Sequence, residues 1–150
     1  MALALLGAGL LLLALAVRCG GPGTVAVRPP DAPGVTATCR TLHAVLPDQV
    51  NAGDRRRTTP ESARTAAWGQ PAVVLRCGVP RPAGLTATSE VVEVDGVGWF
   101  LTERPRAYVF TTVGRTAYVE VRVPASIPRE QATAPLVDVA TALERSVPRV

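Results

Sequence analysis

Two cysteines and the single histidine are the residues of this chain with the clearest potential for chemistry. Cys39 and His43 are four residues apart, which places both side chains on one face if this segment is a helix. With Cys77 they would supply the three ligands of a metal site, or Cys39 and His43 would form a thiol–imidazole pair for nucleophilic catalysis. Neither a CxxC pair nor a second histidine is present. We therefore favour a Cys39–Cys77 disulfide if the domain is exported, keep the metal site as a weak alternative, and expect no cofactor.

A second group with chemical potential is the run of three arginines, Arg55, Arg56 and Arg57. Guanidinium groups bind phosphate and carboxylate, so this run is a candidate site for an anionic headgroup or polymer. A solvated loop explains the same residues without a ligand, because the run is short and Asp54 partly offsets its charge. We accordingly expect residues 49–58 to form a polar loop.

Catalysis by carboxylates is the third possibility. A small hydrolase or transferase would need paired acids, which four glutamates on neighbouring strands would offer: Glu90, Glu93, Glu103 and Glu120. These residues alternate with apolar ones, which predicts that they lie on the solvated face of a sheet. The chain contains no GxSxG elbow, and a phosphate-binding GxxxxGK[ST] loop is impossible without lysine.

Composition excludes some classes of partner. The 150 residues include 16 basic residues, all arginine, against 12 acidic ones, for a net charge of +4. Aromatic residues make up only 4% of the chain, too few for a surface on which bases would stack. We expect no nucleic-acid partner, and we expect Trp68 and Trp99 to pack in the core.

The elements that must position these residues follow from hydrophobic periodicity and turn signals. Asp95-Gly96 and Gly114-Arg115 each predict a tight hairpin turn. Helices are predicted over 38–46, 59–68 and 133–147, and strands over 72–77, 90–94, 97–103, 107–113 and 116–123. The sum is an α+β fold: an antiparallel sheet of about five strands with two or three helices on one face, after an N-terminal apolar segment.

That apolar segment, residues 1–17, has no polar side chain and ends at Arg18. We expect residues 1–18 to be a membrane anchor. A cleaved signal peptide and a lipoprotein signal with Cys19 as the lipidated residue are the alternatives, although Arg18 is not the small residue that lipidation favours before the cysteine. Residues 19–35 read as a Pro/Gly-rich linker, and residues 36–150 as one extracytoplasmic domain.

The basic residues that flank this segment and the cysteine pair of the domain favour opposite orientations in the membrane. No basic residue precedes the apolar run and Arg18 follows it, so the positive-inside rule alone would place the domain in the cytoplasm. A start site upstream of Met1 would remove the conflict by adding a basic region. The cysteine pair favours export.

A family resemblance adds to this reading. The block AAWGQPAVVLRCGVPRP at 66–82, with DGVGW at 95–99, TTVGR at 111–115 and VEVRVP at 119–124, resembles the actinobacterial family called domain of unknown function 3515. The resemblance covers residues 36–147 and implies an N-terminal apolar segment and an extracytoplasmic domain. That family has no assigned activity, so the resemblance implies no catalytic residue.

From these observations we expect a cell-envelope protein at the cell membrane, with its domain on the extracytoplasmic side. It would be a non-catalytic binding or accessory module, with the membrane and an envelope protein as its partners. A secreted or lipid-anchored protein is the alternative location. The alternative functions are a small extracytoplasmic hydrolase or transferase and an arginine-mediated binder of an anionic envelope polymer.

Overall fold

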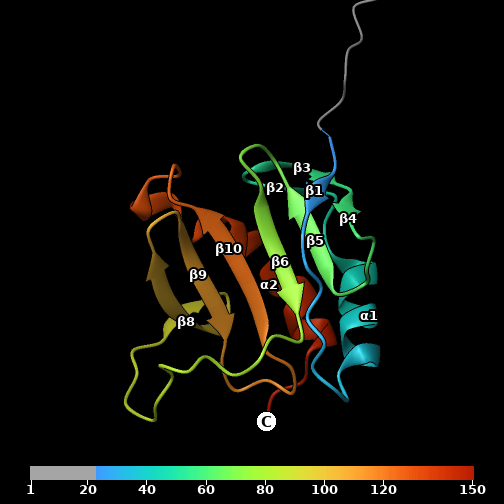
Figure 1. The fold of residues 1–150 in the computed structure, drawn as a ribbon. Helices are drawn as coiled ribbons and strands as arrows, with labels where there is room; N and C mark the ends of the chain where they lie inside the picture. The colour runs from blue at the N-terminus through green and yellow to red at the C-terminus, as the bar shows by residue number, and fades with distance from the viewer. Residues whose placement is uncertain (1–22) are drawn as a thin grey trace, which may run out of the picture.

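The computed structural model describes residues 23–150, which form one large sheet with two α-helices packed against it (Figure 1). The eight strands of the sheet lie in the order β2-β3-β5-β6-β10-β9-β8-β7, and every neighbouring pair is antiparallel. Their bounds are β2 Gln49–Val50, β3 Gly53–Arg56, β5 Thr65–Trp68, β6 Val73–Cys77, β7 Val92–Val94, β8 Val97–Arg104, β9 Ala107–Thr112 and β10 Val119–Pro124. The predicted α+β class and antiparallel sheet are confirmed, whereas the expected number of about five strands is wrong.

The helices cover one face of this sheet. They are α1 (Thr36–Val45) and α2 (Ala134–Ser146), and a short 3-10 helix, η1 (Arg129–Gln131), precedes α2. The apolar stripe predicted for the last helix is buried, with Leu136, Val139, Ala140 and Leu143 each at most 1% exposed. Burying a leucine or valine side chain stabilises a fold by about 2 kcal/mol, so packing against the sheet holds α2 in place.

The helix predicted over 59–68 does not exist. This segment ends β4 (Thr58–Thr59), turns, and continues as β5, in which all four residues are buried. Ala66 and Trp68 belong to the core under the helices, whereas Ala67 points to the opposite face. A strand covered on both faces lacks the apolar–polar alternation that identifies most strands, and its alanines look helical.

The polar loop predicted over 49–58 is also wrong. Residues 49–50 and 53–56 form β2 and β3, which extend the sheet by two strands at one edge. Gly69 is required there: its φ is +69°, and a Cβ at this position would overlap the carbonyl oxygen of Ala52.

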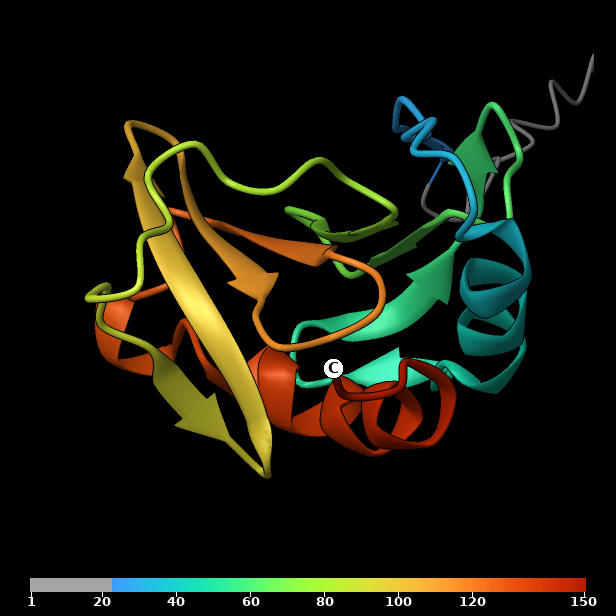
Figure 2. The ribbon, with the colours of Figure 1, turned by 90° about the horizontal axis from the view of Figure 1, so that it is seen from below.

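The face opposite the helices is covered by irregular segments, among them residues 23–34, which we call the N-terminal strap (Figure 2). Within the strap, β1 (Val25–Ala26) pairs in parallel with β4, and Val27 is 6% exposed. This part of the predicted linker 19–35 is therefore packed against the domain, because its apolar residues and backbone groups find partners there.

Within residues 23–150, no helix is both long and apolar enough to cross a membrane. The predicted anchor over 1–18 and the candidate lipidation residue Cys19 lie outside the described residues.

Candidate functional site

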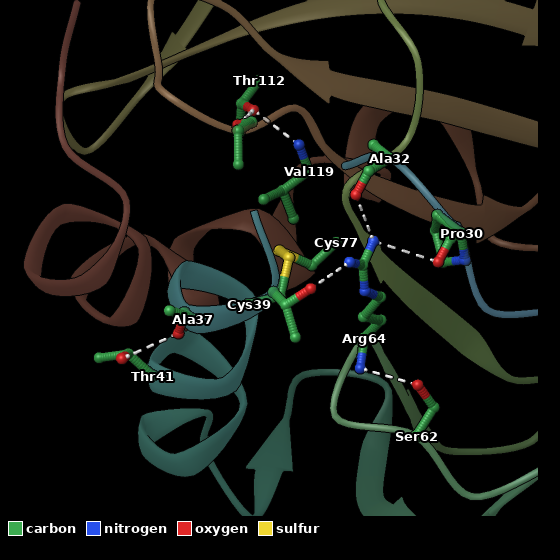
Figure 3. The surroundings of a disulfide bond; sticks show 12 residues. Pro30, Ala32, Ala37, Cys39, Thr41, Ser62, Arg64, Cys77, Thr112 and Val119 are labelled. Atoms are coloured by element: carbon green, nitrogen blue, oxygen red, sulfur yellow. Dashed lines mark hydrogen bonds between the residues drawn. A yellow bond between two sulfur atoms is a disulfide. The ribbon is translucent and has the colours of Figure 1, made fainter. Parts of the chain in front are cut away.

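The two cysteines of the domain lie at disulfide distance, as expected from the sequence (Figure 3). Cys39 of α1 and Cys77 at the end of β6 have their Sγ atoms 2.06 Å apart and their Cα atoms 5.6 Å apart, within the range that a disulfide requires. The alternative metal site of Cys39, His43 and Cys77 would need cysteine thiolates as ligands, whereas the two sulfur atoms are bonded to each other here. Residues 23–150 contain no cluster of three potential metal ligands.

The main cavity lies where α1, β3, β4, β5 and the strap meet. Its volume is about 660 Å³, which is within the usual size of small-molecule sites. Its titratable lining residues are His43, Asp48, Arg55, Arg56, Arg57 and Glu61. The structure thus brings all three candidate anion-binding arginines into one cavity, together with the only histidine.

Arg55 lines this cavity with a side chain that several contacts hold in place. Its Nη1 donates to the carbonyl oxygen of Leu46 at 3.2 Å, and its Nη2 lies 3.0 Å from Nε2 of His43. Its guanidinium also lies over the Trp68 ring, 5.9 Å from the centroid. Burial lowers the pKa of Arg55, and the charge of Asp48 acts in the opposite direction. These contacts hold Arg55 in a single orientation.

Arg56 and Arg57 differ in how available they are to a ligand, because Arg56 is only partly exposed and Arg57 is exposed. Arg56 donates from Nη1 to the carbonyl oxygen of Gly69 at 3.0 Å and from Nη2 to that of Gly23 at 2.5 Å. Its Nε–H is buried and has no hydrogen-bond acceptor among the described residues, so Arg56 gives the cavity its positive charge and offers no exposed donor from this nitrogen. Arg57 is exposed, and its main chain fixes its position by accepting a hydrogen bond from the Val25 N–H at 2.9 Å.

None of these three arginines forms an ion pair with a carboxylate among the described residues. The ion pairs found between residues 23 and 150 use other arginines, namely Arg76, Arg115, Arg122, Arg129 and Arg149. Three arginines against Asp48 and Glu61 give the cavity lining a net charge of +1 while His43 is neutral. An oxyanion in the cavity would therefore meet guanidinium groups that no carboxylate already occupies.

The protonation state of His43 makes the net charge of the cavity depend on pH. Burial and then the positive charge of Arg55 lower the pKa of His43, while the Thr65 backbone and Glu61 act weakly in the other direction. Neutral His43 accepts the hydrogen bond from Arg55 through Nε2. Protonation of His43 adds a further positive charge to the cavity.

Hydroxyl groups complete the lining: Thr24, Thr58, Thr59, Ser62 and Thr65. Two of them already interact, with the Oγ1 atoms of Thr58 and Thr65 3.0 Å apart. Hydroxyl and guanidinium donors around one space are suited to binding the oxygen atoms of phosphate or carboxylate.

A smaller cavity of about 250 Å³ lies between the strap and the sheet face opposite the helices, with Arg28, Arg76 and Arg122 in its lining. Here Glu120 already pairs with Arg76 at 3.2 Å and with Arg122 at 3.7 Å. This cavity is the weaker candidate for an anion site, because a carboxylate of the protein occupies two of its three arginines.

The glutamates considered for catalysis are scattered. Glu90, Glu93 and Glu103 are exposed, Glu120 is held by the two arginines, and none of the four lines either cavity. The sequence identified the three arginines but not their grouping with His43 and Glu61. No spacing rule connects these residues, because they come together only when the edge of the sheet folds onto α1.

Comparison with known proteins identifies a family. No curated protein and no solved structure matches the chain. The sequence does match, over residues 1–150, the family described as Protein of unknown function (DUF3515). Since this match spans the entire sequence, the chain belongs to the DUF3515 family.

Proposed function

We propose that this protein is a non-catalytic binding module of the cell envelope that takes an anionic group, a phosphate or carboxylate, into the main cavity. The observation that carries this proposal is the convergence of Arg55, Arg56 and Arg57 on one cavity, with none of them ion-paired to a carboxylate within residues 23–150. Guanidinium groups form hydrogen bonds to oxyanions that are about twice as strong as neutral ones.

A binding role agrees with the hydrogen bonds of His43 better than a hydrolytic one. A general base would need a free imidazole nitrogen that accepts the proton of a hydroxyl nucleophile. In the structure, Nε2 of His43 lies 3.0 Å from Nη2 of Arg55 instead. The histidine is therefore arranged to respond to charge in the cavity.

For the location of the domain we propose the extracytoplasmic side of the cell membrane, with residues 1–18 as the anchor. The Cys39–Cys77 pair supports this location, because disulfides persist in oxidising compartments. A reporter that is active only outside the cytoplasm, fused after Val150, should be active in cells. Activity of a cytoplasm-specific reporter at the same position would refute export.

Binding is tested with inorganic phosphate as the probe and the full chain in neutral phosphatidylcholine nanodiscs. Replacing Arg57 removes an exposed cavity cation whose side chain forms no hydrogen bond or ion pair within residues 23–150, so Arg57→Gln should weaken phosphate binding about tenfold or more. Arg40→Gln is the matched control, because Arg40 is exposed on α1 and does not line the cavity. Equal affinities for the two variants, or no phosphate binding by the unmodified chain, would refute the proposal.

A further inference from the structure

The main cavity is lined in part by Thr24, close to the point where the described chain enters the domain. Figure 1 shows β1 at this entry point, beside β4. The Gly23 carbonyl accepts the hydrogen bond from Nη2 of Arg56, the Val25 N–H donates to the Arg57 carbonyl at 2.9 Å, and Thr24 lines the cavity. The first residue that the structure describes is thus bonded directly to an arginine of the site. In Figure 1 this end of the domain is opposite the end that carries the C-terminus.

The length of chain between this point and the apolar segment is short. Val17 is the last residue of the apolar run, and Gly23 follows it by six positions. Six residues span at most about 20 Å when fully extended. If residues 1–18 span the membrane as proposed above, the arginines at Gly23 cannot be far from the layer of lipid headgroups, which is about 5–8 Å thick on each side of the hydrocarbon core.

We propose that the ligand of the main cavity is the phosphate of an anionic phospholipid headgroup in the membrane that anchors the chain. This inference rests on the proposed function and names the source of its anionic group. The phosphodiester oxygen atoms would accept hydrogen bonds from the exposed guanidinium of Arg57, with the cavity hydroxyls as further donors.

The net charge of the lipid headgroups should determine whether the cavity docks onto a membrane. The cavity lining carries a net positive charge, as counted above from its arginines and acids. A phosphatidylglycerol headgroup has an uncompensated negative charge, whereas phosphatidylcholine carries its own cation beside the phosphate. One arginine near an anionic membrane changes the ratio of docked to undocked protein by about fivefold. The domain therefore docks its cavity onto anionic membranes and stays on its tether above neutral ones.

The test uses the full chain with ¹³C-labelled histidine in nanodiscs that contain a headgroup-spin-labelled phosphatidylcholine. Since His43 is the only histidine, its imidazole signal is unambiguous, and broadening by the spin label reports how close the cavity lies to the headgroups. Broadening should be stronger in discs that contain phosphatidylglycerol than in phosphatidylcholine discs. Arg57→Gln should abolish the difference, and Arg40→Gln should leave it.

The outcomes separate this inference from the proposed function. Equal broadening in the two membranes overturns the inference. If inorganic phosphate still binds to the chain in neutral discs, anion binding stands and the ligand comes from solution or from an envelope polymer. If neither phosphate nor phosphatidylglycerol affects the His43 signal, the proposed function fails as well.

Discussion

The Cys39–Cys77 bond lends itself to a quantitative prediction, because it joins α1 to the end of β6 across 38 residues of sequence. α1 is otherwise held mainly by Leu42, the other residue within the helix that is buried. Closing a loop of this length removes conformational entropy from the unfolded chain that is equivalent to about 4 kcal/mol at 25 °C. Typical domains have a free energy of unfolding of about 5–15 kcal/mol, so reduction should remove a large share.

The assay is equilibrium unfolding of the full chain in urea, with and without reductant, followed by tryptophan fluorescence. Trp68 and Trp99 are fully buried, so their emission changes on unfolding. With a denaturant dependence of about 2 kcal/mol per molar urea, a loss of about 4 kcal/mol moves the midpoint down by about 2 M.

Two variants control for effects of the reductant itself. Cys39→Ala combined with Cys77→Ala should be as unstable as the reduced protein and insensitive to reductant, while Cys19→Ser should keep the full sensitivity. A shift of less than about 0.5 M, or alkylation of both Cys39 and Cys77 in the unreduced protein, would refute the reasoning.

The remaining predictions concern the edge of the sheet and the cavity. Gly69→Ala should lower the free energy of unfolding by at least about 2 kcal/mol, because it forces a side chain into a left-handed conformation and against the Ala52 carbonyl; an unchanged urea midpoint would contradict this. Arg55→Ala should cost about 1–3 kcal/mol through its lost hydrogen bonds, whereas Arg57→Ala should stay within about 0.5 kcal/mol, as thermal unfolding of the two variants can show. Since the pKa of His43 is lowered in the folded state, its contribution to stability is complete above pH 6.5, the ordinary value for histidine, and is lost as the pH falls through the folded pKa. Unfolding curves across this pH range should show a loss that is smaller in His43→Gln, and an equal loss in both proteins would show that other groups cause it.

The elements that were predicted correctly carry their signals in adjacent residues. Asp95 and Gly96 both have positive φ, at 46° and 80°, as the hairpin turn between β7 and β8 requires. The C-terminal helix was predicted within one residue at each end, because its apolar stripe repeats with the helical period and faces one sheet.

The errors arise where distant segments decide the local structure. The expected tight turn at Gly114-Arg115 is wrong: β9 ends at Thr112 and β10 begins at Val119. Arg115 is buried and donates from Nη1 to the Val147 carbonyl at 2.9 Å. The connection between β9 and β10 is longer than a hairpin turn, and its extra residues let the Arg115 side chain reach the C-terminal segment. No pattern within residues 113–118 indicates that Val147 is the partner of Arg115.

The candidate site also contains features that the sequence predicts and features that it does not predict. The sequence alone supported the arginine run as an anion-binding candidate, since three adjacent guanidinium groups are informative wherever they lie. The contact of Arg56 with Gly23, 33 residues earlier, and the placement of His43 against Arg55 depend on the strap and on α1 packing against β3. Periodicity describes single elements and cannot predict such contacts between them.

The most direct test of anion binding in the main cavity is the pKa of His43, measured by NMR titration of its single imidazole signal with and without inorganic phosphate. A bound anion stabilises the imidazolium form, so phosphate should raise the pKa of His43 from its lowered value. Arg57→Gln should reduce this rise, and Arg40→Gln should not. A pKa of His43 that is unchanged at phosphate concentrations well above those of the protein would contradict the account.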